Sequence, residues 1–279
     1  MTSRRTYPSD LTDAQWAIVE SLLPPRPASI APARHDLREI VNAILYVART
    51  GIAWRYLPHD FPPHTTVYDY FARWEGDGTA QRVHDALREQ VRRSKGRRVL
   101  PTAAIIDAQV VKSSPNAPAD TVGYDMGKRT KGRKRHIATD TLGLLLVLVI
   151  TAASVQDSAG GRRVLEALHA AHPGVTKAWA DGGYNNGVVQ QAADHGIELE
   201  IVKRSDDVKG FQVLPRRWVV ERTFGWFVQH RRLVRDYEAH PERSAAMIHW
   251  AMTDTMVRRL THPNRRQPHD LLPKPPASA

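Results

Sequence analysis

The apolar residues of this 279-residue chain change their spacing near residue 99, and this change limits the possible folds more than any other feature. Before it, apolar side chains recur at helical spacing in four stretches, at about residues 12–23, 36–51, 65–74 and 79–95. The first opens with a capping box of Thr12 and Gln15, and the second begins at Asp36 and stops at Gly51. The first hundred residues therefore predict a small all-helical domain.

After residue 99 the pattern predicts strands and helices in the order β-β-β-α-β-α-β-α. The expected strands cover residues 100–112, 135–141, 144–154, 176–181 and 197–202, and the expected helices cover 161–171, 185–195, 218–235 and 244–260. This order is typical of an α/β domain with helices packed on a mixed sheet. We place the helical domain at 1–98 and the α/β domain at 99–261, and we expect disorder in the tail 262–279 and in the first nine residues.

The charge of the chain indicates a polyanionic partner. Forty Lys and Arg face 29 Asp and Glu, which gives a formal net charge of +11 with neutral His, and nucleic acid is the first candidate for so basic a chain. The alternative explanation of the net charge is that the proteins of the source organism are generally rich in surface arginine. Residues 141–200 carry more acidic than basic side chains, whereas the segments on either side are basic. A site that holds divalent cations beside phosphates would use carboxylates framed by Lys and Arg in this way.

The absence of cysteine excludes several kinds of site. Disulfide scaffolds, thiolate zinc sites and cysteine nucleophiles are ruled out, so any metal must bind oxygen or imidazole. The longest apolar run, from Leu142 to Ala153, is far shorter than the roughly 20 residues that cross a bilayer. We expect a soluble, cytoplasmic protein without a membrane partner.

Three carboxylates lie in sequence settings where a charged side chain needs an explanation. Asp107 interrupts an apolar strand, so its charge needs a cation or several hydrogen bonds, in a functional site or in a salt bridge. Asp181 ends a short strand before two glycines, a setting shared by ligand sites and ordinary turns. Glu221 lies in a helix that is apolar on most sides, where it is either the solvent-facing residue or a group held inside for chemistry. Gly225, one turn later, is expected to leave room beside it.

Together the three acids predict a metal site. Two strands and a late helix can bring them to one end of the sheet, and oxygen ligands select Mg²⁺ or Mn²⁺. Two such ions about 3.5–4 Å apart activate a water or a 3′-hydroxyl and stabilise the leaving oxygen in phosphodiester displacement. The expected catalytic and metal-binding residues are Asp107, Asp181 and Glu221.

In these settings the three acids resemble the DDE triad of bacterial insertion-sequence transposases, most of all the group named after insertion sequence five. Segments 123–136, 140–145 and 206–211 also resemble blocks of that group, and the likeness spans about residues 8–260. The resemblance implies an RNase H-like catalytic domain that cleaves DNA at the ends of a mobile element and joins them to target DNA.

The wider signature of that group places a Tyr seven residues before the Glu and a basic residue seven after it. This chain has Leu214 and Val228 at those positions, and it keeps the expected arginine as Arg217. We expect Arg231 and Arg232, one helical turn beyond Val228, to supply the missing charge.

Two basic features indicate contacts with DNA phosphates. Residues 128–135 hold six basic side chains and no acid, although a solvated hairpin arm would look the same. Arginines also recur around the predicted helix 218–235. The expected DNA-binding residues are Lys128, Arg129, Lys131, Arg133, Lys134, Arg135, Arg217, Arg231 and Arg232.

The second and third predicted helices have the pattern of a helix-turn-helix element that reads terminal repeats. In that arrangement residues 65, 66, 68, 69 and 73 face DNA, while residues 67, 70, 71 and 74 pack. A helical bundle used for dimerisation predicts the same pattern.

The leading hypothesis is a transposase that uses two Mg²⁺ or Mn²⁺ ions. Its expected partner is double-stranded DNA, namely the terminal inverted repeats of the element and the target, bound by a homo-oligomer at the nucleoid. The alternatives are an RNase H-like nuclease that acts on other nucleic acids, and a DNA-binding regulator that occupies the repeats without cutting them.

Overall fold

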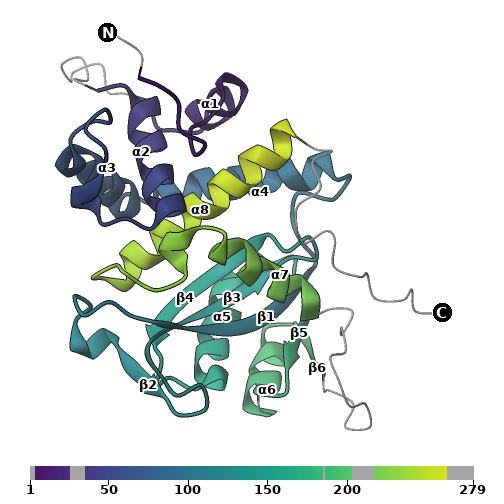
Figure 1. Ribbon diagram of the computed structural model, residues 1–279. Coiled ribbons are helices and arrows are strands. Elements are labelled where there is room, and N and C mark those ends of the chain that lie inside the picture. The colour runs from purple at the N-terminus through teal and green to yellow at the C-terminus, as the bar shows by residue number, and fades with distance from the viewer. Residues whose placement is uncertain (1–3, 26–34, 185, 203–216, 263–279) are drawn as a thin grey trace.

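The computed structural model describes residues 4–25, 35–184, 186–202 and 217–262. Helices gather at one end of the molecule, and a sheet with its own helices forms the other end (Figure 1). The first four helices are α1 (Asp13–Glu20), α2 (Leu37–Thr50), α3 (His64–Gly76) and α4 (Thr79–Ser94), with a short 3₁₀ helix, η1 (Trp54–Tyr56), after α2. The predicted helical start of the chain is confirmed.

Local sequence explains where α1 and α2 begin and end. The Thr12 hydroxyl accepts a hydrogen bond from the backbone N–H of Gln15, and the Gln15 side chain accepts one from the N–H of Thr12. Asp36 caps α2 through a single bond, in which its Oδ1 accepts from the N–H of Arg38 at 2.9 Å. Gly51 ends α2 with a φ of 76°, a left-handed conformation that favours glycine.

The other end of the molecule is built on a six-stranded mixed sheet. Its strands are β1 (Ala103–Lys112), β2 (Gly123–Asp125), β3 (Thr130–Thr139), β4 (Leu145–Ala152), β5 (Lys177–Asp181) and β6 (Glu198–Val202). Strand β1 pairs antiparallel with β3 and parallel with β5, which pairs parallel with β6. Strands β2 and β4 both pair antiparallel with β3. A second 3₁₀ helix, η2 (Ala119–Thr121), precedes β2.

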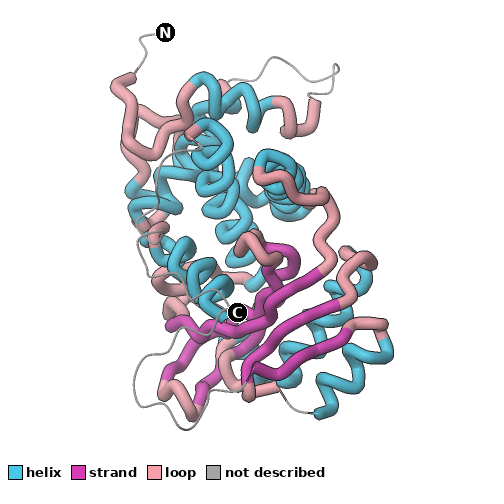
Figure 2. Tube along the Cα trace, turned by 90° about the vertical axis from the view of Figure 1, so that its right-hand side faces the viewer, coloured by secondary structure: helices cyan, strands magenta, loops and turns pink. Residues whose placement is uncertain are grey.

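Helices cover both faces of this sheet, as Figure 2 shows. Helices α5 (Asp157–Ala171) and α6 (Asn186–Asp194) share a core with Ala104 and Ala178 on one face. Helix α7 (Arg217–Val228) covers the opposite face, where Ile105 and Trp179 share a core with Trp226 of α7. We call this the α7 face. The predicted mixed sheet flanked by helices is confirmed.

The last helix, α8 (Pro241–Thr261), joins the helical end of the molecule. It packs against α1, α2, α3 and α4, and Figure 1 shows it running alongside α4. It also contacts α7 and β4, so one apolar core runs from the helices to the α7 face. The sequence pattern predicts this segment as part of the α/β domain 99–261, but α8 packs with the first helices. We call α1–α4 together with α8 the helical bundle.

The start of the described chain differs from the expectation of disorder. The ring of Tyr7 lies 4.8 Å from that of Tyr46 and 5.3 Å from that of Phe61, measured between centroids. The disorder expected for residues 4–9 is therefore wrong, because aromatic packing holds this segment on α2. The expected tail, apart from residue 262, lies outside the described residues.

Two elements of the second half also differ from expectation. The helix expected over 218–235 ends at Val228, because His230 leaves the helical conformation and its Nε2 lies 3.0 Å from Asp254 Oδ2 in α8. A 3₁₀ helix, η3 (Arg231–Leu233), follows. The strand expected to begin at residue 135 begins at Thr130, because β2, which was not anticipated, pairs with its first residues.

Candidate active site

Asp107 and Asp181 stand at matching positions of neighbouring parallel strands. Ile105 of β1 pairs in register with Trp179 of β5, and each aspartate comes two residues later on its strand. Because side chains two residues apart share a face of a sheet, both carboxylates belong to the α7 face. The structure thus places these two predicted residues on the same face of neighbouring strands, two residues beyond the last pair in register.

Backbone donors orient the two carboxylates. The N–H of Ala108 donates to Asp107 Oδ1 at 2.7 Å, and the N–H of Gly183 donates to Asp181 Oδ1 at 2.9 Å. Both aspartates are half-buried. A Cβ added at Gly182 would meet no described atom within 4 Å, so the described residues leave room at this position of the turn after Asp181.

Helix α7 lies over β1 and β5 and carries the third predicted acid, Glu221. Two side chains anchor the helix to the turn between β3 and β4. Thr223 Oγ1 donates to the Gly143 carbonyl at 2.7 Å, and Arg222 Nη2 donates to the Leu142 carbonyl at 2.8 Å. Glu221, next to these anchors, is exposed above the α7 face.

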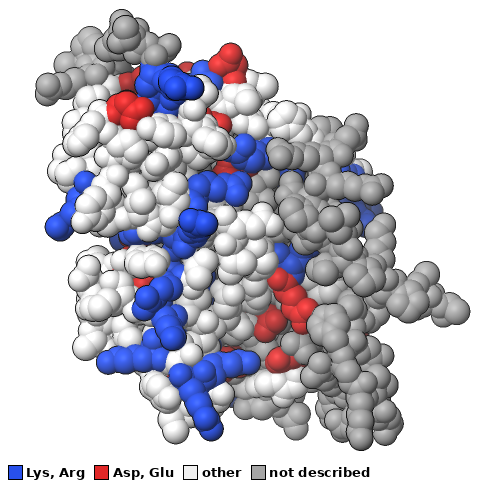
Figure 3. Space-filling model, viewed as in Figure 1, with Lys and Arg blue, Asp and Glu red and all other residues white. Residues whose placement is uncertain are grey.

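The three acids fit a hard divalent cation by their chemistry, but their placement does not close into one ligand set. All three offer carboxylate oxygens, and acidic side chains gather on the surface where α7, β1 and β5 lie (Figure 3). Within the described residues, no group of three His, Asp or Glu lies close enough to hold one metal ion. A Cβ at Gly225 would meet no described atom within 4 Å, which agrees with the room that the sequence predicts beside Glu221.

Four of the expected DNA-binding residues lie within β3, and all of them except Lys131 are buried. Arg133 is fully buried, and its guanidinium donates to Asp236 Oδ2 at 3.1 Å and to the Glu238 carbonyl at 2.8 Å. Arg135 donates to the Leu233 carbonyl at 2.8 Å, and burial lowers its pKa to about 10. Lys134 between them is 5% exposed. The fold uses these side chains internally, so we leave them out of the proposed DNA contacts.

The remaining expected DNA-binding residues have different surroundings. Arg232 is buried, with its Nε 2.8 Å from Glu238 Oε1 and its Nη1 donating to the Ile52 carbonyl at 2.8 Å. The side chain of Arg217, the first residue of α7, lies outside the described part of the structure. The exposed members of the set are Lys128, Arg129, Lys131 and Arg231.

Helix α3 contains the residues expected to read DNA. Residues 65, 69 and 73 are exposed, while Val67, Phe71 and Trp74 are buried, as both the DNA-reading and the dimerisation hypotheses require. Tyr68, expected to face DNA, instead packs its ring on Trp54 with centroids 5.4 Å apart.

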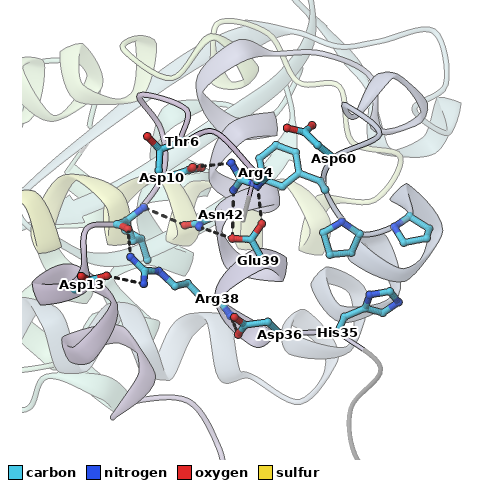
Figure 4. A pocket seen from close by; sticks show the side chains of 14 residues that line it. Arg4, Thr6, Asp10, Asp13, His35, Asp36, Arg38, Glu39, Asn42 and Asp60 are labelled. Carbon is cyan, nitrogen blue, oxygen red and sulfur yellow. Dashed lines mark hydrogen bonds and ion pairs between the residues drawn. The ribbon is translucent and has the colours of Figure 1, made fainter. Parts of the chain in front are cut away.

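A pocket of about 690 Å³ in the helical bundle is lined by charged side chains that bind one another (Figure 4). Arg4 donates to Glu39 Oε2 at 2.6 Å and to Asp10 Oδ2 at 2.7 Å, and Arg38 pairs with Asp13 at 2.7 Å. These pairs tie the first described residues to α1 and α2. Because Arg4 and Arg38 are already paired with acids, we do not assign the pocket as a site for a polyanion.

Two acids have structural roles that their sequence motifs did not reveal. Asp140 is fully buried, binds Arg92 of α4, and accepts the N–H groups of Leu142 and Leu144 at 2.8 Å, so it closes the turn between β3 and β4. Asp157 opens α5 beside the turn after Asp181. Its only sequence signal is the polar segment 156–158 before a helical stretch.

His136 of β3 gives a pH-dependent prediction. The ring is fully buried beneath Gly160 of α5, and burial lowers its pKa to about 4. The unfolded chain binds this proton near pH 6.5, so the free energy of unfolding should fall as pH decreases from 6.5 to 4, by up to about 1.4 kcal/mol per unit.

Urea unfolding at several pH values measures this slope. The variant His136→Gln should be less stable at pH 8, because the packing under Gly160 is lost, but its stability should fall less steeply below pH 6.5. Equal slopes for the two proteins would contradict the prediction.

Comparison with known proteins gives consistent matches. The model of a family described as "Transposase DDE domain" matches residues 99–253, more than half of the chain, and that of a family described as "Putative transposase of IS4/5 family" matches residues 11–84. A "Putative transposase for insertion sequence element IS402" from Burkholderia cepacia is 32% identical over 145 residues, which cover 49% of this chain and 64% of that protein. The match thus spans somewhat less than two thirds of this relative.

The described part of the chain has no helix that is long and apolar enough to cross a membrane. The longer family match includes Asp107, Asp181 and Glu221, together with the whole sheet and the helices on both of its faces. The chain therefore belongs to the transposase DDE domain family, and its mixed sheet with flanking helices has the RNase H-like fold of that family.

Proposed function

We propose that this protein is a DDE transposase that cleaves double-stranded DNA at the ends of an insertion sequence and joins these ends to target DNA. The observation that carries the proposal is the matching placement of Asp107 and Asp181 beneath the helix that carries Glu221. Carboxylates brought to one face from separate segments repel one another unless a cation offsets their charge. Family membership supports DNA as the substrate and a general dependence on divalent metal ions.

Asp107, Asp181 and Glu221 are the residues that we propose to hold two Mg²⁺ or Mn²⁺ ions. Divalent ions bound there supply the activation of a water or a 3′-hydroxyl and the stabilisation of the leaving oxygen. The N–H groups of Ala108 and Gly183 orient the two aspartates, and α7, which contacts both strands, carries Glu221.

The exposed basic residues form a band next to the acidic surface. Figure 3 shows Lys and Arg side chains that run from the helical bundle toward the β2 end of the sheet. Backbone pairing joins the parts of this band, because the N–H of Asp236 donates to the Lys112 carbonyl at 2.9 Å and Lys112 pairs with Gly132 of β3. The basic band consists of Lys112, Lys128, Arg129, Lys131, Arg231 and Arg235. We propose that the phosphate backbone of the duplex follows it.

Removing one charge from the basic band should weaken DNA binding for every sequence alike. We expect Lys131→Ala and Arg231→Ala each to reduce the slope of log affinity against log salt by about 0.9, because each residue releases about one counterion. Fluorescence anisotropy between about 50 and 200 mM salt measures the slope. Lys177→Ala is the control, since Glu198 and Glu200 already bind that ammonium. An unchanged slope in both variants would contradict the proposal that the DNA backbone follows the basic band.

The proposed function is tested with labelled DNA that carries the inverted repeats flanking this reading frame, together with a plasmid target. We expect cut ends to become joined to the plasmid when Mg²⁺ or Mn²⁺ is present and not when the metal is chelated. Cutting without joining would instead indicate an RNase H-like nuclease. Retention of DNA without any cutting would indicate a DNA-binding regulator.

We further infer that the protein acts as a homo-oligomer on DNA, at the nucleoid, because the two ends of an element must be held together while they are joined. Light scattering with and without end DNA should show at least two protomers in the DNA complex. A complex that contains one protomer and two ends would contradict this part of the proposal.

A further inference from the structure

Lys134 is a buried cation whose partners lie on segments around the turn after Asp181. Its side chain is 5% exposed, and its Nζ lies 2.9 Å from Asp157 Oδ1, 2.9 Å from the Val155 carbonyl and 3.0 Å from Asp125 Oδ2. The ammonium therefore donates to one carbonyl and forms ion pairs with two carboxylates. Lys134 therefore points its charge inward, toward the start of α5.

The first turn of α5 abuts the turn that follows Asp181. Ser158 Oγ donates to the Gly183 carbonyl at 3.1 Å, and the N–H of Gly183 donates to Asp181 Oδ1 at 2.9 Å. A Cβ placed on Gly183 would lie 3.0 Å from Asp181 Oδ1 and 3.7 Å from Asp157 Oδ2. The carboxylates of Asp157 and Asp181 thus face the same backbone position, and Asp157 reaches Lys134 through its other oxygen.

Two carboxylates so placed repel each other, and partial burial strengthens the repulsion. The Lys134 ammonium offsets the charge of Asp157, so α5 can stay in contact with the Asp181 turn without driving Asp181 away. Ser158 adds a neutral link to the same turn. The three side chains together couple β3 to the candidate carboxylate on β5.

We propose that Lys134 is a positioning residue, which acts through Asp157 and Ser158 to hold the Asp181 turn where Asp181 binds a divalent cation. This inference rests on the proposed function, because it takes Asp181 as a cation ligand. The competing explanation is that Lys134 only ties β2 to α5 for stability. The two partners of Lys134 distinguish these explanations, because Asp125 and Asp157 share one ammonium and Asp157 is the one that faces the Asp181 turn.

The first test measures Mn²⁺ binding to the full chain without DNA, from the electron paramagnetic resonance signal of free Mn²⁺. We expect Asp157→Asn to weaken Mn²⁺ binding about tenfold, the scale found when a partner of a metal ligand is changed. The matched variant Asp125→Asn removes the same kind of partner from Lys134 and should bind Mn²⁺ as the wild type does. Thermal unfolding without metal checks that both variants are folded. Equal Mn²⁺ affinities for the two variants would overturn the inference.

A second test uses Lys134→Met alone and combined with Asp157→Asn. The single change leaves the negative charge of Asp157 without its cationic partner and should weaken Mn²⁺ binding. The double change also removes the charge of Asp157 and should recover part of the Mn²⁺ affinity. Absence of recovery in a folded double variant would overturn the inference. If Lys134→Met does not fold, the comparison of Asp157→Asn with Asp125→Asn decides.

The variant Asp181→Asn distinguishes a failure of the proposed cation site from a failure of the positioning role of Lys134. If it leaves Mn²⁺ binding unchanged, the proposed cation site fails and the positioning role fails with it. If it weakens Mn²⁺ binding while Asp157→Asn does not, the inference about Lys134 alone is wrong.

Discussion

Replacing Asp181 with asparagine is expected to lower the joining of DNA ends at least about a hundredfold, the scale of losing one group that stabilises a transition state. The amide has the shape of the carboxylate, and its oxygen still accepts the N–H of Gly183, so the fold should persist. What disappears is the charge that attracts a divalent ion. Asp107→Asn should behave alike, because its amide oxygen can keep the bond from Ala108. The yield of joined product measures the loss, and thermal unfolding measures stability.

The matched control is Glu198→Gln, which removes an exposed acid that binds Lys177 at the far edge of the sheet. We expect wild-type yields from it and a loss as large as that of Asp181→Asn from Glu221→Gln. Full activity in Glu221→Gln would remove α7 from the proposed site. Equal losses in Glu198→Gln would show that the assay responds to any missing negative charge.

The largest effect on stability is expected at Asp254 of α8. Its carboxylate is fully buried and binds Arg49 of α2 at 2.7 Å, Arg258 at 2.6 Å and His230 at 3.0 Å. Asp254→Asn keeps the shape but leaves this basic cluster without its counter-ion. We expect a loss of about 3–5 kcal/mol in the free energy of unfolding, the usual result of breaking a buried ion pair by removing one partner. Urea unfolding near pH 7 measures it.

The control for Asp254 is the exposed pair of Glu89 and Arg93 on α4, where Glu89→Gln should cost no more than about 0.5 kcal/mol. Burial opposes ionisation of Asp254, but His230 and the two arginines outweigh it and hold its pKa below the usual 3.8. Because the folded value is the lower one, this stabilisation is present above pH 3.8 and is lost as pH falls below it. A loss under 1 kcal/mol in Asp254→Asn at pH 7 would contradict the role of the cluster.

Features that depend on neighbouring residues could be predicted from the sequence. The capping box at Thr12 and the stop at Gly51 need only a few adjacent positions, and both are present in the structure. The shared face of Asp107 and Asp181 follows from two apolar strands with an acid at the same point of each. The position of Glu221 relative to them depends on how α7 docks on Gly143, a contact between residues 80 positions apart.

The basic run in β3 shows why other features could not be predicted. Six basic side chains in eight residues look like a solvated surface, yet Arg133 and Arg135 find acceptors on the segment 233–239. Lys134 finds its acceptors at the start of α5 and on β2. The partners of Arg133 lie up to 106 positions away in the chain, so no local sequence pattern predicts them. The same reason hid the role of α8, whose partners are the first helices of the chain.

Within the described residues, one continuous core joins the helical bundle to the α7 face, so these two parts should move as one body. If α3 binds the duplex, the distance along the DNA from the bound sequence to the active-site carboxylates would then be fixed by the protein. The number of base pairs between the recognised sequence and the cleaved phosphodiester bond would be the same at both ends of the element, whatever bases lie between.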